Sequence, residues 1–169
     1  KKRIMKRNLL LLLLTIFLLS ACSQKDRELS TADETEKIEN LLEKYMIAIE
    51  NEDDASIENI WDVGDSTMLL GTDSHERLMS WKSINQAYKN QFGLIDETFI
   101  SIQDQFIRVS CSGKTAWFSQ RMNYNFIYDS IARSYEGIRF TGVLQKNKDQ
   151  EWKIVQGHLS VPAQVNIGK

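Results

Sequence analysis

A set of polar side chains in the last third of the chain has the types and spacing of a ligand-binding surface. Three strands are expected there, and residues two apart on a strand point to the same side of a sheet. Arginine binds a carboxylate through paired hydrogen bonds, and histidine and hydroxyl groups add further contacts. If the three faces coincide, they line a pocket for a small organic ligand that bears a carboxylate. The set comprises Trp117, Arg121, Arg139, Thr141, His158 and Ser160.

The same residues also have a purely structural interpretation. His158 could hydrogen-bond within the sheet, and the two arginines could lie on its solvated face. A slip of one residue in strand pairing turns every side chain of a strand to the other face, and the spacing does not determine the register. Both interpretations therefore remain open.

Other candidates for chemistry are few. Asp73 and His75 could take part in acid–base catalysis or bind a metal ion. They lie, however, in a polar stretch between a predicted strand and a predicted helix, where solvated loops are common. The acids expected on strands, Asp104, Asp129 and Glu136, lack the apolar neighbours that would raise their pKa for proton transfer. The sequence has no glycine-rich phosphate loop, nucleophile elbow or zinc spacing. We therefore expect no metal and no cofactor, assign no catalytic residue, and favour binding over catalysis.

The N-terminal residues predict where the protein resides. Basic residues precede an 11-residue apolar run at 9–19, which is too short to span a bilayer and is typical of a secretory signal. The run ends in Leu19-Ser20-Ala21-Cys22, which resembles the bacterial lipoprotein signal, in which the cysteine is acylated. We expect residues 1–21 to be the signal peptide, with Cys22 attached to the membrane through lipid.

The residues around this cysteine refine the expected location. Residues 22–32 have no apolar periodicity and predict a flexible tether, followed by one domain over 33–169. Ser23 resembles the residue found in outer-membrane-sorted lipoproteins, and 22–28 resembles a surface-export signal. The expected location is the cell envelope: the outer membrane in a Gram-negative bacterium, with surface exposure suggested by that second resemblance.

Charge and cysteine content narrow the expected partners. Without residues 1–21 the chain has 148 residues, a length that suits a single domain. Its net charge is then −7, which disfavours nucleic acid as a partner. With Cys22 acylated, Cys111 has no disulfide partner within the chain, so we expect it to be a small buried residue.

Apolar spacing divides the domain into helices followed by strands. A helix is expected from about residue 32, begun by a capping box of Thr31 and Glu34. A second helix is capped by Asp53 or Asp54, a strand lies within 62–72, and a third helix runs from Ser80 to Gly93. Strands are expected at about 97–110, 114–128, 134–147 and 151–162. Such long strands must bend, so we expect an α+β fold whose curved antiparallel sheet and helices enclose a cavity.

The C-terminal strand pair resembles a known family. The segments GIRFTGVL (137–144) and WKIVQGHLSVP (152–162), with Ala116-Trp117-Phe118 before them, look like SnoaL-like proteins of the nuclear transport factor 2-like superfamily. The end of the chain is also similar to the calcium/calmodulin-dependent kinase II association domain. The resemblance implies a cone-shaped curved antiparallel sheet closed by three N-terminal helices, with a pocket, often dimeric through the sheet.

Fold alone does not decide the function of such a domain. Members of the superfamily include isomerases, dehydratases, cyclases, ligand binders and assembly domains. We expect a lipid-anchored envelope protein that binds a small organic ligand or acts in assembly. The alternatives are an enzyme of the isomerase, dehydratase or cyclase type and a structural dimerisation module.

Overall fold

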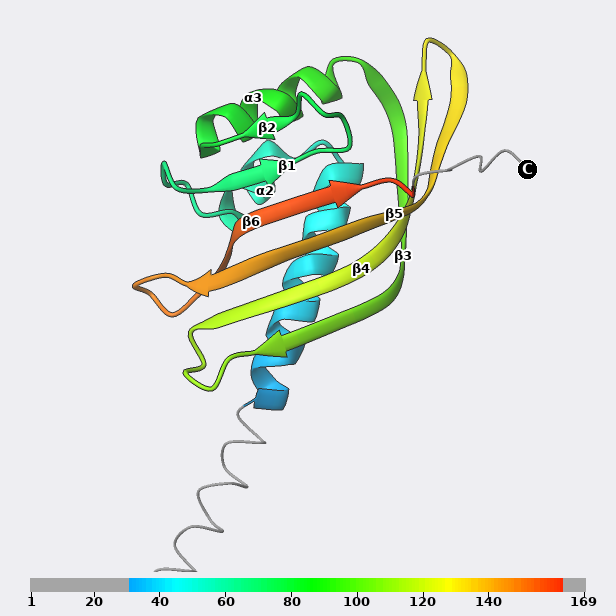
Figure 1. Ribbon diagram of the computed structural model, residues 1–169. Helices are drawn as coiled ribbons and strands as arrows, with labels where there is room; N and C mark the ends of the chain where they lie inside the picture. The colour runs from blue at the N-terminus through cyan, green and yellow to red at the C-terminus, as the bar shows by residue number, and fades with distance from the viewer. Residues whose placement is uncertain (1–30, 163–169) are drawn as a thin grey trace, which may run out of the picture.

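A curved six-stranded sheet that does not close on itself forms the body of the molecule (Figure 1). The computed structural model describes residues 31–162. Its strands lie in the order β2-β1-β6-β5-β4-β3. Their bounds are Met68–Leu70 (β1), Arg77–Leu78 (β2), Ile95–Val109 (β3), Thr115–Tyr128 (β4), Ile131–Lys146 (β5) and Trp152–Ser160 (β6).

The four long strands fall close to their predicted positions, but the sheet is not wholly antiparallel. β1 runs parallel to β6, with Leu69 opposite Gly157, while the other neighbouring strands are antiparallel. Parallel pairing needs a long connection between the two strands, and the whole of α3, β3, β4 and β5 lies between β1 and β6. The expected antiparallel sheet is therefore a mixed sheet. Of the strand predicted within 62–72, only 68–70 pairs.

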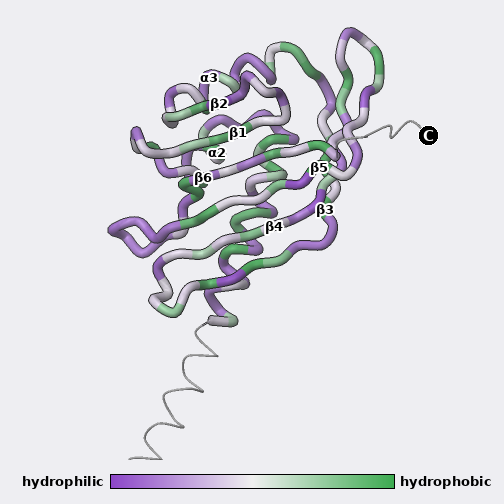
Figure 2. The backbone as a smooth tube through the Cα atoms, viewed as in Figure 1, coloured by the Kyte–Doolittle hydropathy of each residue, from purple (hydrophilic) through white to green (hydrophobic). Residues whose placement is uncertain are grey.

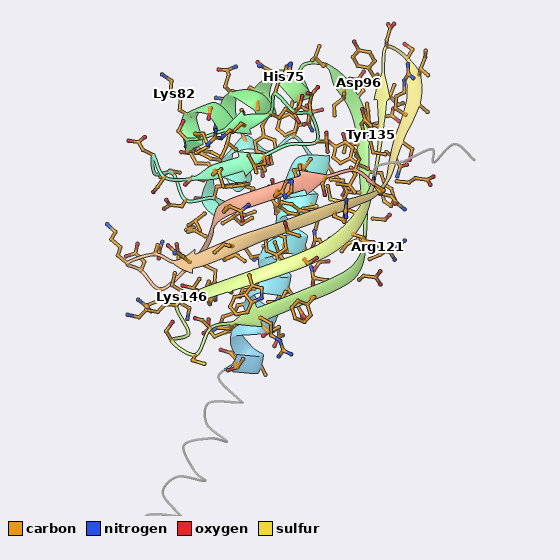
Figure 3. The ribbon with its side chains drawn as sticks, viewed as in Figure 1. His75, Lys82, Asp96, Arg121, Tyr135 and Lys146 are labelled. Atoms are coloured by element: carbon orange, nitrogen blue, oxygen red, sulfur yellow. The ribbon has the colours of Figure 1, made fainter. Side chains whose placement is uncertain are left out.

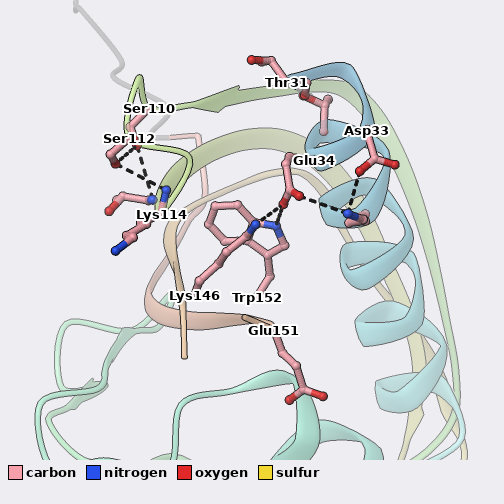
Figure 4. Close-up of polar contacts among 12 residues, drawn as sticks. Thr31, Asp33, Glu34, Ser110, Ser112, Lys114, Lys146, Glu151 and Trp152 are labelled. Atoms are coloured by element: carbon pink, nitrogen blue, oxygen red, sulfur yellow. Dashed lines mark hydrogen bonds and ion pairs between the residues drawn. The ribbon is translucent and has the colours of Figure 1, made fainter. Parts of the chain in front are cut away.

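The N-terminal helix, residues 31–50, lies across one face of the sheet (Figure 1). Apolar and polar residues alternate along it (Figure 2), and the apolar residues at helical spacing are buried, with Ile38 and Leu42 fully enclosed. The predicted capping box is wrong. Thr31 already lies within the helix, and the Glu34 side chain reaches Lys146 and Trp152 instead (Figure 4).

The two shorter helices begin as their caps predict. In α2 (Asp54–Ile60), the Asp53 carboxylate accepts a hydrogen bond from the Ser56 N–H at 3.0 Å. In α3 (Trp81–Phe92), Ser80 and Ser83 form a reciprocal capping box. Both caps satisfy backbone N–H groups that the first turn of a helix leaves without partners.

The core lies between the helices and the face of the sheet that they cover. Phe118 and Phe140 meet edge to face on that side of β4 and β5, and Tyr45 of the N-terminal helix packs on Phe140. Cys111 is not part of this core. It lies exposed in the turn between β3 and β4, which corrects the expectation of a buried thiol. The turn places it beyond the last paired residues of both strands.

The outer part of the β4–β5 hairpin projects beyond the sheet (Figure 1). A register shift between Met122 and Tyr124 marks where the hairpin leaves the body. Gly137 lies opposite this shift with φ +66°, a left-handed conformation that glycine adopts without strain. The bend brings hairpin side chains over the end of the core beside α3.

Candidate functional site: an aromatic cavity

A cavity of about 270 Å³ lies between the helices and the covered face of the sheet. The N-terminal helix and α3 form one wall, and β4, β5 and the last residues of β6 form the other. The exposed residues of its lining lie in the loop that joins β1 to β2, residues 71–76, and on the β4–β5 hairpin, so we place its mouth between them. The cavity thus opens where the helical layer and the projecting hairpin meet.

Four of the chain's five tyrosines line this cavity. Tyr45 and Tyr88 are buried at its closed end, where their hydroxyl groups form a hydrogen bond. Tyr124 lies farther along β4 and accepts a hydrogen bond of 2.6 Å from the Gln91 side chain. Tyr135 stands half exposed on the hairpin, at the mouth (Figure 3).

Burial keeps the enclosed phenols protonated. It raises the pKa of Tyr45 to about 12, although the Tyr88 hydroxyl, which is hydrogen-bonded to it, and the nearby Trp61 indole act in the opposite direction. Burial likewise raises the pKa of Tyr124 to about 12 and that of Tyr88 well above its usual range. All three hydroxyls are therefore neutral near pH 7 and able to donate a hydrogen bond.

Glu76 supplies the one carboxylate that lines the cavity within residues 31–162. Its side chain is held at the mouth, where Oε2 accepts a hydrogen bond of 3.0 Å from the Asp73 N–H. Gly71 makes room for it, because a β-carbon there would lie 2.0 Å from the same oxygen. The carboxylate is exposed, unlike the tyrosines at the closed end.

The six residues predicted to form a pocket come together, but on the other face of the sheet. Strand pairing sets Arg121 opposite Arg139, and Thr141 opposite His158. The prediction that these side chains share one side of the sheet is therefore correct. We call the group the outer-face set: Trp117, Arg121, Arg139, Thr141, His158 and Ser160.

The outer-face set does not line the enclosed cavity. The side chain of Arg121 is 54% exposed, projects from the sheet (Figure 3) and forms an ion pair with Asp104, while Arg139 is exposed as well. The reason is the alternation itself, because Phe118, Gln120 and Met122 occupy the covered side of β4. The expectation of an enclosed Arg-lined pocket is wrong; ligand binding on the open face stays a prediction.

Asp73 and His75 lie on the exposed loop at 71–76, outside the cavity lining. Hydrogen bonds from the His75 N–H and the Ser74 hydroxyl hold the pKa of Asp73 below its usual value. The aspartate thus stabilises its own turn. Across residues 31–162 no three His, Cys, Asp or Glu side chains are grouped as metal ligands.

A wider cleft of about 530 Å³ lies near β1, the end of β5 and the first half of β6, but its cations are already engaged. Lys146 pairs with Glu34 at 2.7 Å, and Lys153 contacts the Asn59 carbonyl and Glu151. The enclosed aromatic cavity is therefore the stronger candidate site.

The sequence contained a signal for this cavity that polar motifs do not reveal. Tyr45 follows Ile38 and Leu42 at helical spacing, and Tyr88 follows Trp81 and Ile84 in the same way. The pattern identified these tyrosines as core-facing. Their hydroxyl groups need partners inside the core, which distinguishes them from ordinary packing residues.

The chain belongs to the SnoaL-like domain family, whose model matches residues 38–164. The match covers the helices, the mixed sheet and therefore the whole cavity. Comparison with curated, characterised proteins gives no match.

Solved structures of the nuclear transport factor 2-like superfamily share this fold. A superfamily member from Salmonella enterica serovar Typhimurium has a TM-score of 0.73 at 17% identity, covering 82% of this chain and 97% of its own. A proposed scytalone dehydratase from Novosphingobium aromaticivorans has a TM-score of 0.71 at 11% identity, with 86% and 93% covered. A ketosteroid isomerase-like protein from Erwinia carotovora atroseptica has a TM-score of 0.61 at 14% identity, with 75% and 95% covered. At these identities the likeness concerns the fold.

Proposed function

We propose that this protein binds a small organic molecule in the aromatic cavity. The observation that carries the proposal is a cavity of about 270 Å³, open on one side, that places four tyrosines and apolar side chains around one volume. Ligand sites are typically concave and mostly apolar, with a few polar groups that orient the ligand. This volume lies just below the usual range for ligand sites, about 300–1,000 Å³, and suits a molecule of one or two rings.

A cavity-filling variant tests this proposal. Ala87 lines the cavity from α3, whereas its neighbour Gln86 is exposed on the same helix. Ala87→Phe should abolish binding of small aromatic probes in ligand-observed NMR, because the added ring occupies their place. Gln86→Phe adds the same ring outside the cavity and should leave binding unchanged. Equal binding to both variants would locate the probes elsewhere.

We also propose that the binding domain is held at the envelope through lipid on Cys22. That residue lies outside the described part of the chain, which begins nine residues later. The proposal of a lipid anchor is supported by the sequence Leu19-Ser20-Ala21-Cys22 after a short apolar run. Among residues 31–162, no helix combines the length and apolar character needed to cross a bilayer.

The outer-face set is proposed to meet a second copy of the chain. Trp117 is 47% exposed near the start of β4, and Phe106 on the neighbouring strand is exposed as well, beneath the Arg108 guanidinium. Aromatic and arginine side chains are the residues most often central to protein interfaces. The family resemblance implies dimers that form through the sheet, which supports this face as the contact surface.

A second candidate function is proton transfer on a bound ligand, for which Glu76 would be the base. Its carboxylate reaches the same cavity as the tyrosine hydroxyls, which could stabilise a developing oxyanion. The structures with a similar fold include a proposed scytalone dehydratase and a ketosteroid isomerase-like protein.

Deuterium exchange distinguishes catalysis from binding. If Glu76 is a base, the protein should accelerate exchange of the protons beside the carbonyl of a bound ketone in D₂O. Glu76→Gln should remove that acceleration without removing binding, whereas Asp73→Asn should retain it. Binding without any exchange leaves the protein a binder.

A further inference from the structure

The outer face of the sheet carries a surplus of positive charge where a second copy of the chain is proposed to bind. We infer that two copies meeting there enclose an oxyanion with two or more negative charges, such as phosphate or a dicarboxylate, and that this anion controls dimerisation. The inference rests on the proposed contact between copies and names the chemistry that the contact requires.

Three exposed arginines supply the positive charge. Arg108 lies on β3 opposite Trp117, and Arg121 on β4 lies opposite Arg139 on β5, so strand pairing sets all three on one side of the sheet. The Arg121 side chain projects from this face (Figure 3). Like charges directly opposite each other in a sheet are destabilising. An anion bound over this pair would relieve the repulsion.

Acidic side chains neutralise only part of this charge. Asp104, at an irregularity of β3, forms an ion pair with Arg121. Arg139 forms no ion pair within residues 31–162. Glu136, exposed three residues before it in the sequence, forms none there either. The guanidinium of Arg139 is therefore available to a negative group from outside the chain.

Polar side chains beside Arg139 complete a setting for an oxyanion. Ser160 lies opposite Arg139 on β6, and Thr141 and His158 form the next pair on the same side. Within the described part of the chain, none of these three side chains has a hydrogen-bond partner. Hydroxyl groups can donate hydrogen bonds, and a guanidinium presents two parallel N–H groups to an oxyanion. The group therefore offers several donors within reach of one small anion.

A symmetric contact through this face doubles its charge. In a two-fold dimer the same patch lies on both sides of the contact, so positive charge faces positive charge. Trp117 lies four residues before Arg121 on β4, a distance of about 14 Å along the strand. A stable interface covers about 800 Å² on each copy, a disc about 16 Å in radius, so a contact around Trp117 reaches the arginines. Without an anion these charges oppose the contact, and with one they hold both copies.

Sedimentation velocity of the full chain over a concentration series tests the inference. The dimer dissociation constant is measured in sodium chloride, sodium phosphate and sodium succinate at one pH and one ionic strength. The chains compared are the parent, Arg139→Gln and Arg133→Gln. Arg133 is exposed on the projecting hairpin, outside the outer-face set, so the last variant is the control.

Phosphate or succinate should lower the dissociation constant of the parent dimer at least about tenfold relative to chloride, because the anion gains charge-assisted hydrogen bonds from both copies. Arg133→Gln should respond as the parent does. Arg139→Gln should dimerise more tightly than the parent in chloride, because a repelling charge is removed. Its response to either oxyanion should be less than about twofold, because its guanidinium donors are lost.

The outcomes separate the anion from the contact itself. A parent dimer with the same dissociation constant in all three salts would overturn the inference and leave the contact between copies standing. A parent chain that is monomeric in all three would refute both. If Arg139→Gln keeps the full response, the oxyanions act through a general salt effect, and the inference is also overturned.

A second measurement needs no variant. In chloride alone, the parent dimer should tighten as the salt rises from about 50 mM to about 300 mM, because screening weakens the repulsion between like charges. A dissociation constant that stays constant or rises with salt would show that these charges do not oppose the contact, and would overturn the inference.

Discussion

Glu34 joins the N-terminal helix to the last residue of β5 and the first residue of β6. Its carboxylate lies 2.7 Å from both Lys146 Nζ and Trp152 Nε1 and 3.0 Å from Lys37 Nζ (Figure 4). Partial burial raises the pKa of this carboxyl group, but the hydrogen bonds from the lysines and the indole outweigh it and lower the pKa to about 2. The contribution to stability is therefore complete above the unfolded value near 4.5 and disappears as the pH falls towards 2.

Replacement of Glu34 by Gln should remove this acid-sensitive stabilisation. We expect a loss of about 1–2 kcal/mol in the free energy of unfolding at pH 7, after allowance for solvent screening, and a much smaller difference from the parent near pH 2. Urea unfolding at both pH values measures it. Glu36→Gln, an exposed change on the same helix, is the control. Equal losses at pH 7 and pH 2 would assign the effect to packing.

The sequence identified the residues of the cavity better than it identified their role. Core positions such as Tyr45 and Tyr88 followed from helical spacing. The outer-face set was grouped correctly, but alternation does not say which side meets the helices. Composition offered a guide, because Phe118 and Met122 on one side of β4 are more apolar than Ser119 and Arg121 on the other.

At the scale of elements, α3 positions much of the site. It carries Ala87, Tyr88 and Gln91 to the cavity, and its start is held by the capping box of Ser80 and Ser83. The Ser80 hydroxyl accepts the Ser83 N–H at 3.3 Å. The cap therefore helps to position the Tyr88 side chain at the closed end of the cavity.

Replacement of Ser80 by Ala should destabilise the domain by about 1 kcal/mol, because a backbone N–H at the helix start loses its acceptor. Thermal or urea unfolding measures the loss. Ser66→Ala, in the exposed loop before β1, should change the stability by less than about 0.5 kcal/mol. A loss no larger than that of the control would show that the cap does not limit stability.

Local signals predicted the helices and long strands well, since caps and alternation depend on nearby residues. The parallel pairing of β1 with β6 was missed because it joins segments almost ninety residues apart, such as Leu69 and Gly157. The three-residue β1 is also too short to show alternation. The faces of the sheet were undetermined for the same reason, since they depend on how distant elements pack.

For the molecule as a whole, the proposed lipid anchor predicts that the protein partitions into the membrane fraction of the cell. The full chain should fractionate with membranes, and Cys22→Ser should release it, because stable anchoring needs the acyl chains. Cys111→Ser is the matched control, since that thiol lies in an exposed turn of the domain. Cell fractionation followed by immunoblotting measures the change. Membrane association that survives Cys22→Ser would contradict the anchor.

The proposed contact between two copies predicts a concentration-dependent dimer. Trp117→Ser should weaken dimerisation at least about thirtyfold, as expected for a central aromatic residue of an interface. Sedimentation velocity over a concentration series measures it. Val63→Ser removes an exposed apolar side chain from the loop after α2, outside the outer-face set, and should have no effect. A parent chain that stays monomeric at every concentration would rule out the contact.

The interruptions in β3 have a consequence for how copies of the chain can associate. β3 ends the strand order, so its outer backbone groups offer a template on which another chain could polymerise. Register shifts between Asp96 and Phe99 and between Gln103 and Phe106 leave no regular run longer than Phe99–Gln103. Glu97 and Asp104, within these shifts, adopt positive φ angles that an added straight strand cannot follow. The β3 edge of the sheet is thereby protected against fibril growth, while the outer face of the sheet stays open to a partner.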